Sequence, residues 1–173
     1  MACLLMVIPP ENFRDEELFE TRVILEWAGH RTVLASTVTG LCPGSCGGAA
    51  KAELLLEQAR AEDYDGVIFI GGSGVRSLFW NPQALALAAA MHKRAKMVAA
   101  ICLAPVILAN AGVLNGRRAT VSSSESATIE ARGAIYAGPG VVVDGNVVTG
   151  DGPKVCEKFA QSIDSLLRQR RAA

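Results

Sequence analysis

The sequence predicts a doubly wound α/β fold, with a mainly parallel sheet covered by helices on both faces. Short apolar runs bounded by turn residues alternate with longer segments of helical period, which is the pattern of strands buried on both faces. The chain has 173 residues, and 50% of them are hydrophobic. This is enough for one core of ordinary size, so we expect a single domain over residues 1–173.

The elements are predicted from local patterns along the chain. Apolar runs between turn residues predict strands over 2–8, 32–36, 66–70, 96–101 and 119–122. Helical periodicity, with proline at helix starts and glycine at helix ends, predicts helices over 16–29, 51–61, 82–94, 104–111 and 153–170. Asp144-Gly145 predicts a hairpin that pairs 140–144 with 146–149. The glycine-rich segment 40–48 is expected to be a mobile loop.

Charge and cysteine content narrow the class of partner. The 17 basic residues balance 17 acidic ones, so no overall field favours a nucleic acid or a membrane surface. No apolar run reaches the ~20 residues of a membrane helix, and the N-terminal apolar run lacks the basic flank of a signal peptide. The five cysteines are irregularly spaced, as in a protein with reduced thiols. We expect a cytoplasmic protein that acts on a small molecule.

Cys102 is the first candidate for chemistry. Ligands of open α/β sheets bind beyond the carboxyl ends of the parallel strands, and Cys102 lies between the predicted strand ending at Ile101 and the helix that Pro105 opens. Such a turn exposes its side chain, and a helix N-terminus lowers a thiol pKa. The backbone N–H groups of Leu103 and Gly72 could hold an oxyanion. The alternative is a buried structural cysteine, and the position of Cys102 favours the first interpretation.

Other segments at the same predicted edge supply candidate substrate-binding residues. They are Gly71 after the third strand, Ser122 after the fifth, and Pro153 after the last. The run from Gly72 lacks the third glycine of a dinucleotide fingerprint. Cys42 and Cys46 have no second Cys/His pair at metal spacing. They are read as loop thiols, with a disulfide or redox pair as the alternative. No metal or cofactor is therefore expected.

Four segments together resemble the DJ-1/PfpI superfamily, over about residues 2 to 168. They are Asn12-Phe-Arg-Asp-Glu-Glu-Leu18, Tyr64-Asp-Gly-Val-Ile-Phe-Ile-Gly-Gly72, Ala99-Ala-Ile-Cys-Leu-Ala-Pro105 and Val142-Val-Asp-Gly-Asn-Val-Val-Thr149. The resemblance implies a flavodoxin-like fold, a homodimer, and a reactive cysteine that hydrogen-bonds a glutamate of the first helix. The matching glutamate is Glu17, rather than Glu11 or Glu16. A protonated carboxyl there would favour the thiolate and move protons; without the resemblance, Glu17 could equally be a solvated helix residue.

The sequence departs from peptidase-like members of this superfamily. Those members place a histidine directly after the nucleophile and an acid on a neighbouring subunit, whereas these positions here are Leu103 and Arg76. His30 and His92 are the only histidines, and both are expected at the surface. A Cys-His-acid triad is therefore not predicted.

Four functional hypotheses follow. The first is a glyoxalase- or deglycase-like enzyme in which Cys102 adds to a small reactive carbonyl and Glu17 moves the proton. The second is a redox sensor or protective protein through oxidation of Cys102. The third is a peptidase or amidase, which Leu103 disfavours, and the fourth is a dimeric interaction module. Catalysis by Cys102 and Glu17 is the hypothesis that we carry forward.

Overall fold

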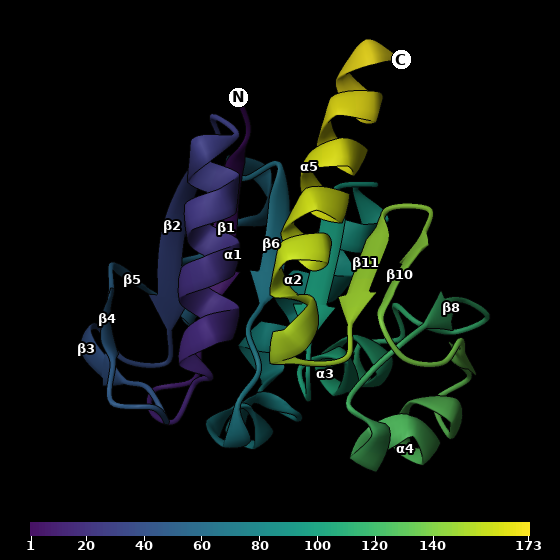
Figure 1. Ribbon diagram of the computed structural model, residues 1–173, viewed down its shortest axis with the longest axis horizontal. Helices are drawn as coiled ribbons and strands as arrows, with labels where there is room; N and C mark the ends of the chain where they lie inside the picture. The colour runs from purple at the N-terminus through teal and green to yellow at the C-terminus, as the bar shows by residue number, and fades with distance from the viewer.

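The computed structural model describes residues 1–173, and its centre is a seven-stranded sheet between helices (Figure 1). From edge to edge the strands are β10 (Val141–Asp144), β11 (Val147–Gly150), β7 (Met97–Ile101), β6 (Gly66–Phe69), β1 (Cys3–Val7), β2 (Arg31–Ser36) and β5 (Leu54–Leu55). All neighbours are parallel except β10 and β11, which form the predicted hairpin. The predicted α/β class is confirmed.

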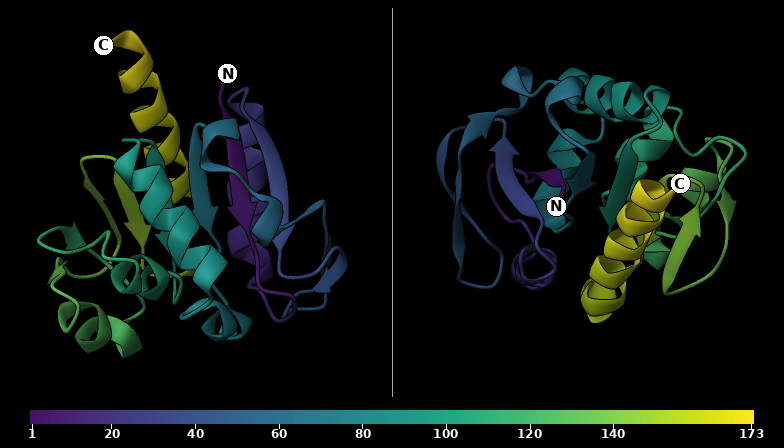
Figure 2. Two further views of the ribbon diagram at one scale, coloured as in Figure 1. Left: turned by 180° about the vertical axis from the view of Figure 1, so that it is seen from behind. Right: turned by 90° about the horizontal axis from the view of Figure 1, so that it is seen from above.

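Helices cover both faces of this sheet, as the view from above shows (Figure 2). One face packs against α1 (Asp15–Trp27) and α5 (Cys156–Ala172), which also contact each other. The other packs against α2 (Pro82–Lys93), α3 (Pro105–Asn110) and α4 (Ser126–Glu130). None of these helices combines the length and the apolar composition that spanning a bilayer requires.

The central strands are apolar at every position because both of their faces are buried. In β1, Leu5 and Val7 belong to the core under α2 and α3, whereas Leu4 and Met6 belong to the core under α1 and α5. Successive side chains of a strand point to opposite faces. A continuous apolar run is therefore what a strand between two helical layers requires.

The predicted helix over 51–61 is wrong. Ala49–Ala52 forms β4, which pairs with β3 (Gly40–Pro43) in an antiparallel hairpin, and Leu54–Leu55 forms β5 at the edge of the main sheet. Burial alternates along β4, with Ala50 and Ala52 inside, which is the period of a strand. Short 3-10 turns at Leu56–Gln58 and Ala61–Asp63 complete the connection to β6.

The segment 40–48 contains β3 and the turn of the β3–β4 hairpin, where the sequence predicted a loop. Beyond the β3–β4 pairing, the buried carboxylate of Asp15 binds the tip of this hairpin: Oδ1 accepts the Cys46 N–H at 3.0 Å and Oδ2 accepts the Gly48 N–H at 2.7 Å. A Cβ on Gly44 or Gly48 would collide with the same carboxylate. The glycines therefore allow a close approach between this hairpin and the start of α1.

The predicted strand over 119–122 is shorter and lies elsewhere. Only Arg118–Ala119 (β8) is extended, and it pairs with β9 (Ile135–Tyr136) in a small parallel sheet of its own. The place beside β11 in the main sheet is taken by β10.

The parallel strands end at one edge of the sheet, the lower edge in Figure 1. Val7 at the end of β1 pairs with Phe69 at the end of β6, and Phe69 pairs with Ala100, one residue before the end of β7. The loops after β1, β6 and β7 therefore leave the sheet side by side, which brings residues distant in sequence to one place.

Candidate active site

Cys102 lies on the turn between β7 and α3, as predicted. Its φ of 64° is in the left-handed region, which is strained for a residue with a side chain. Two backbone hydrogen bonds hold it there: its N–H donates to the Gly150 carbonyl at 2.9 Å, and its carbonyl accepts the Ser122 N–H at 2.7 Å. The residue is half-buried, so it is not enclosed in the hydrophobic core.

Glu17 lies in the first turn of α1 and is completely buried. Its Oε2 accepts the Gly71 N–H at 2.9 Å, whereas its buried Oε1 has no partner of ordinary hydrogen-bond geometry. The Cys102 thiol lies beside this carboxyl and acts on it as a hydrogen-bond donor. The carboxyl thus has one oxygen without a partner, and the Cys102 thiol acts on the same group.

Gly71 is the contact point between these two side chains. A Cβ on Gly71 would lie 2.6 Å from Cys102 Cβ and 2.6 Å from Glu17 Oε2. The next residue, Gly72, has a φ of 105°, and a Cβ there would lie 2.5 Å from the Arg14 nitrogen. Glycine at both positions allows the loop after β6 to pass between the cysteine and the start of α1.

The pKa of Glu17 and the pKa of Cys102 are both raised. Burial raises the pKa of Glu17 to about 7, against the effect of hydrogen bonds from Cys102 and Gly71. Burial, and then the negative charge of Glu17, raises the pKa of the Cys102 thiol to about 12. The N–H groups of Gly72 and Leu103 act on the sulfur as donors and lower its pKa. The predicted fall in thiol pKa is therefore wrong, because burial and the carboxylate outweigh both donors.

Together, the two groups form one acid–base pair. Between the two pKa values the pair holds a single proton, on either the sulfur or the carboxyl. With that proton on Glu17, the carboxylate charge that raises the thiol pKa is absent, and the Glu17 O–H can donate to the thiolate. The pair can thus form a thiolate by moving its proton from the sulfur to Glu17, although the two pKa values place that proton mainly on the sulfur.

The remaining predicted residues line the same edge in different ways. Ser122 is half-buried, and its backbone N–H rather than its hydroxyl contacts Cys102; the hydroxyl lies 3.5 Å from Ser124 Oγ. Pro153 is half-buried at the start of the short turn Pro153–Val155, three residues after the Gly150 carbonyl that accepts the Cys102 N–H. It lies at the edge of the candidate site.

Both histidines lie away from this edge. His30 is buried, not at the surface as predicted: Nδ1 accepts the Ala2 N–H at 3.1 Å and Nε2 lies 2.9 Å from Asp164 Oδ1. It thus ties the start of β1 to α5. His92 is half-buried near the end of α2, where burial lowers its pKa. A Cys-His-acid triad is not assembled, in agreement with the prediction.

Arg76 and Glu125 are site-edge residues whose pairing was not predicted. Arg76 Nη1 donates to Glu125 Oε1 at 2.7 Å, although the two residues are 49 positions apart. The triple serine before Glu125 gave no signal for this contact. The only sequence signal was the basic residue at the position where peptidase-like proteins have an acid.

Neither a metal cluster nor a disulfide accompanies the site. No group of three or more His, Cys, Asp or Glu side chains could hold a metal ion. All five cysteines are free; Cys42 is buried in β3 and Cys46 is exposed, so the disulfide alternative for this pair is not supported.

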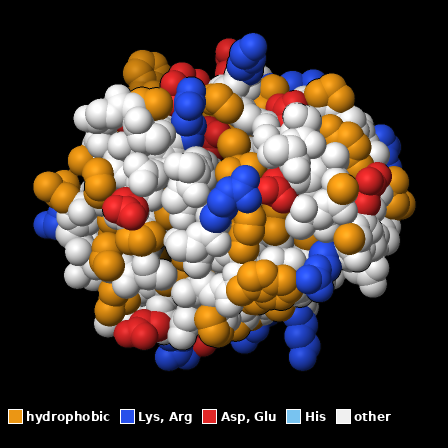
Figure 3. Space-filling view, turned by 90° about the horizontal axis from the view of Figure 1, so that it is seen from below, with side chains coloured by type: hydrophobic (Ala, Val, Ile, Leu, Met, Phe, Trp, Pro, Cys, Tyr) orange, Lys and Arg blue, Asp and Glu red, His pale blue; other side chains and the backbone are white.

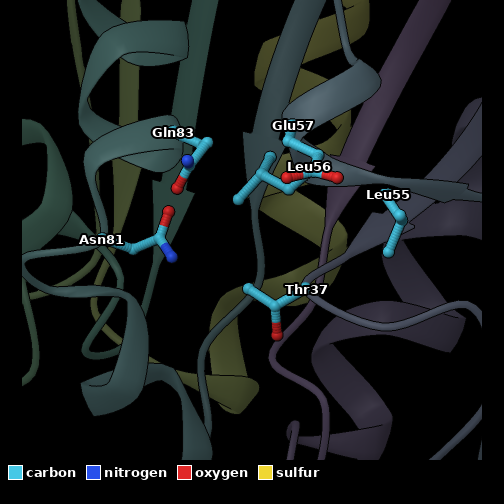
Figure 4. Close-up of a pocket in the computed structure, with 6 residues that line it drawn as sticks. All are labelled: Thr37, Leu55, Leu56, Glu57, Asn81 and Gln83. Carbon is cyan, nitrogen blue, oxygen red and sulfur yellow. The ribbon is translucent and has the colours of Figure 1, made fainter.

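A separate pocket of about 180 Å³ lies between the β5 segment and the start of α2 (Figure 4). It is lined by Thr37, Leu55, Leu56, Glu57, Asn81 and Gln83. None of these residues belongs to the pair or to its backbone donors, and Asn81 Oδ1 already caps α2 by accepting the Ala84 N–H. The candidate chemistry therefore lies at Cys102 and not in this pocket.

Comparison with known proteins identifies the family. Residues 3–165 match the model of the DJ-1/PfpI family. The chain belongs to the DJ-1/PfpI family. An uncharacterized protein of Methanocaldococcus jannaschii is 39% identical over 165 residues, which cover 94% of this chain and 80% of that protein.

Solved structures and named relatives agree with this membership in the DJ-1/PfpI family. The crystal structure of a ThiJ/PfpI domain protein from Brachyspira murdochii superposes with a TM-score of 0.94 at 34% identity, and 96% of each chain is covered. A protein of Pyrococcus horikoshii named as a deglycase is 31% identical over 163 residues, covering 94% of this DJ-1/PfpI chain and 98% of the relative.

Proposed function

We propose that this protein is a cofactor-independent enzyme that acts on small reactive carbonyls, with Cys102 as nucleophile and Glu17 as proton carrier. The observation on which this depends is the buried Glu17 carboxyl, with one oxygen unpartnered, beside a partly exposed thiol. Relatives named as deglycases support the substrate class. The absence of a nearby histidine also favours proton transfer at carbon over amide hydrolysis.

The first step joins the sulfur to the aldehyde carbon of a 2-oxoaldehyde. The thiolate of Cys102 attacks while Glu17 holds the proton, and the developing oxyanion accepts hydrogen bonds from the Gly72 and Leu103 N–H groups. Glu17 then gives its proton to that oxygen. The product is a hemithioacetal, and this step involves no net oxidation or reduction of the substrate.

The second step moves one proton between adjacent carbons. The Glu17 carboxylate removes the hydrogen of the former aldehyde carbon as a proton, and the resulting enediol is protonated at the neighbouring carbon. One carbon is oxidised and the other reduced within the same molecule, which leaves a thioester of a 2-hydroxy acid on Cys102. Water hydrolyses the thioester, releasing the 2-hydroxy acid and restoring the thiol.

Turnover of methylglyoxal to lactate tests this proposal. We expect Cys102→Ser to abolish lactate formation and Glu17→Gln to lower it by at least about a hundredfold, because general acid–base catalysis contributes about 10² to 10⁴ in rate. Cys46→Ser, which removes the exposed thiol, is the matched control and should retain full activity.

Two outcomes would contradict the proposal. Unchanged turnover in Cys102→Ser would remove the nucleophile from the mechanism. A wild-type protein without turnover, in which mild peroxide oxidises Cys102 selectively, would support the redox function instead.

A further inference from the structure

Arg76 lies four residues after Gly72, and most of the hydrogen-bonding capacity of its side chain is unused. A guanidinium has five N–H donors. In this structure only one of them has an acceptor in the protein: Nη1 donates to Glu125 Oε1 at 2.7 Å. The Arg76 side chain is 54% exposed, whereas the Glu125 side chain is 12% exposed. The buried partner thus orients an exposed cation without consuming its remaining donors.

Glu125 is itself held in place. Its Oε2 accepts the Thr128 hydroxyl at 2.7 Å, so both carboxylate oxygens have partners. The guanidinium carbon of Arg76 also lies 5.7 Å from the centre of the Phe79 ring. Charged hydrogen bonds and an aromatic neighbour both restrict the guanidinium, which is therefore preorganised.

The place of the Arg76–Glu125 ion pair follows from the two segments that carry its residues. Arg76 lies on the turn that starts at Gly72, and Glu125 lies three residues after Ser122. Gly72 donates to the Cys102 sulfur, and the Ser122 N–H donates to the Cys102 carbonyl. The ion pair thus joins two segments that both touch Cys102. The view of this edge shows basic side chains standing among apolar ones (Figure 3).

Arg14, which acts electrostatically on Glu17, has fewer free donors than Arg76. Its Nε and Nη2 both bind the Glu16 carboxylate, at 2.8 and 3.3 Å. This contact uses a two-pronged face of the guanidinium, whereas Arg76 keeps Nε and Nη2 free. Arg76 therefore keeps two neighbouring N–H donors, on Nε and Nη2, that can bind both oxygens of a planar anion.

We propose that Arg76 binds the carboxylate of the substrate, so that the preferred substrates are 2-oxoaldehydes bearing a carboxylate group. This inference rests on the proposed function and names its substrate class. The two free N–H donors of Arg76, on Nε and Nη2, match the two oxygens of a carboxylate in geometry. The Glu125 charge already balances that of Arg76, which suits a monoanion better than a doubly charged phosphate.

Turnover of two probes tests the substrate class. The first is 4,5-dioxopentanoate, a 2-oxoaldehyde with a carboxylate, and the second is neutral methylglyoxal. We expect the wild type to prefer the carboxylated probe, and Arg76→Gln to lower kcat/KM for that probe by about tenfold or more, as for the loss of one charged hydrogen bond. The value for methylglyoxal should stay within about twofold. An equal loss for both probes, or no preference in the wild type, would overturn the inference.

Alkylation of Cys102 tests Arg76 without any turnover, so that failure of this inference is distinguishable from failure of the proposed function. Iodoacetate and iodoacetamide differ chiefly in the carboxylate, and peptide mass spectrometry separates Cys102 from the exposed Cys46. We expect Arg76→Gln to lower the iodoacetate-to-iodoacetamide rate ratio at Cys102 several-fold and Arg76→Lys to restore part of it. Arg60→Gln, at an exposed ion pair with Glu62 before β6, is the control and should leave the ratio unchanged.

A double variant separates binding by Arg76 from exposure of the Glu125 charge. Arg76→Gln alone leaves an unpaired carboxylate that would repel any anion. In Arg76→Gln/Glu125→Gln that charge is also absent, and we expect the iodoacetate preference to remain lost. A wild-type ratio in the double variant, or in Arg76→Gln itself, would show that Arg76 does not bind the anion.

Discussion

At the scale of single residues, the central feature is a carboxylic acid that stays protonated to about pH 7 because it is buried. The pKa of Glu17 is raised to about 7, and burial is the largest cause. One oxygen of this carboxyl has no hydrogen-bond partner, and the half-buried Cys102 acts on the carboxyl as a hydrogen-bond donor. A buried acid with a single spare hydrogen-bonding position is well suited to pass a proton to a neighbour and take it back.

The same burial makes the stability of the protein depend on pH. The folded-state pKa of Glu17 lies above its unfolded value of 4.5, so the native state holds more protons and stability falls as pH rises through about 7. We expect Glu17→Gln to gain about 3 kcal/mol in unfolding free energy relative to the wild type between about pH 4 and about pH 8. Urea unfolding at both pH values measures this. A constant difference would contradict the raised pKa.

At the scale of elements, the start of α1 and the β3–β4 hairpin form one unit through Asp15. This residue precedes Glu17 by two positions, and both of its carboxylate oxygens bind backbone N–H groups of the hairpin. The hairpin therefore supports the helical turn that positions Glu17.

Removing this carboxylate should loosen the hairpin. We expect Asp15→Ala to lower the unfolding free energy by about 3 kcal/mol, since two charged hydrogen bonds are lost, and to speed amide exchange at Cys46 and Gly48. Hydrogen exchange measured by NMR checks this. Asp65→Ala is the control, because Asp65 Oδ2 accepts only the Cys3 N–H, at 2.8 Å. Unchanged exchange at Cys46 and Gly48 would show that Asp15 does not hold the tip.

How well an element could be predicted depended on how local its signal is. The central strands are buried on both faces, and their apolar runs are readable in any short window. β4, β5 and β8 are two to four residues long, and they exist because of pairing with distant segments. The run Leu54–Leu56 has the composition of a helix, yet tertiary pairing at the sheet edge overrides that preference.

The candidate site divides in the same way. Cys102 was predictable because a strand, a turn and Pro105 are adjacent in sequence, whereas Glu17 was distinguished from Glu11 and Glu16 only by the family resemblance. The pairing of Arg76 with Glu125 and the burial that raises both pKa values arise from the tertiary structure. No local pattern contains them.

At the scale of the whole molecule, the homodimer stays a prediction, and helix α1 offers a surface on which to test it. Phe19, Val23 and Trp27 are spaced four residues apart on α1 and are 37%, 53% and 89% exposed. Residues four apart share a helix face, and an exposed apolar row favours association.

We expect analytical ultracentrifugation to give a dimer for the wild type and a monomer for Trp27→Glu, because a buried charge at the interface would be unpaired. Trp80→Glu changes an exposed tryptophan of the Cys102 edge and should remain dimeric. A monomeric wild type, or a Trp27→Glu variant that stays dimeric, would contradict an interface on α1.

The most direct test of the account is the pH profile of Cys102 alkylation by iodoacetamide, followed by peptide mass spectrometry in the wild type and in Glu17→Gln. If Cys102 and Glu17 exchange one proton as a pair, the wild-type rate rises with a midpoint near pH 7 and then levels off, and this step is absent in Glu17→Gln. The exposed Cys46 reports an ordinary thiol in the same samples. Identical Cys102 profiles in the two proteins would contradict the account.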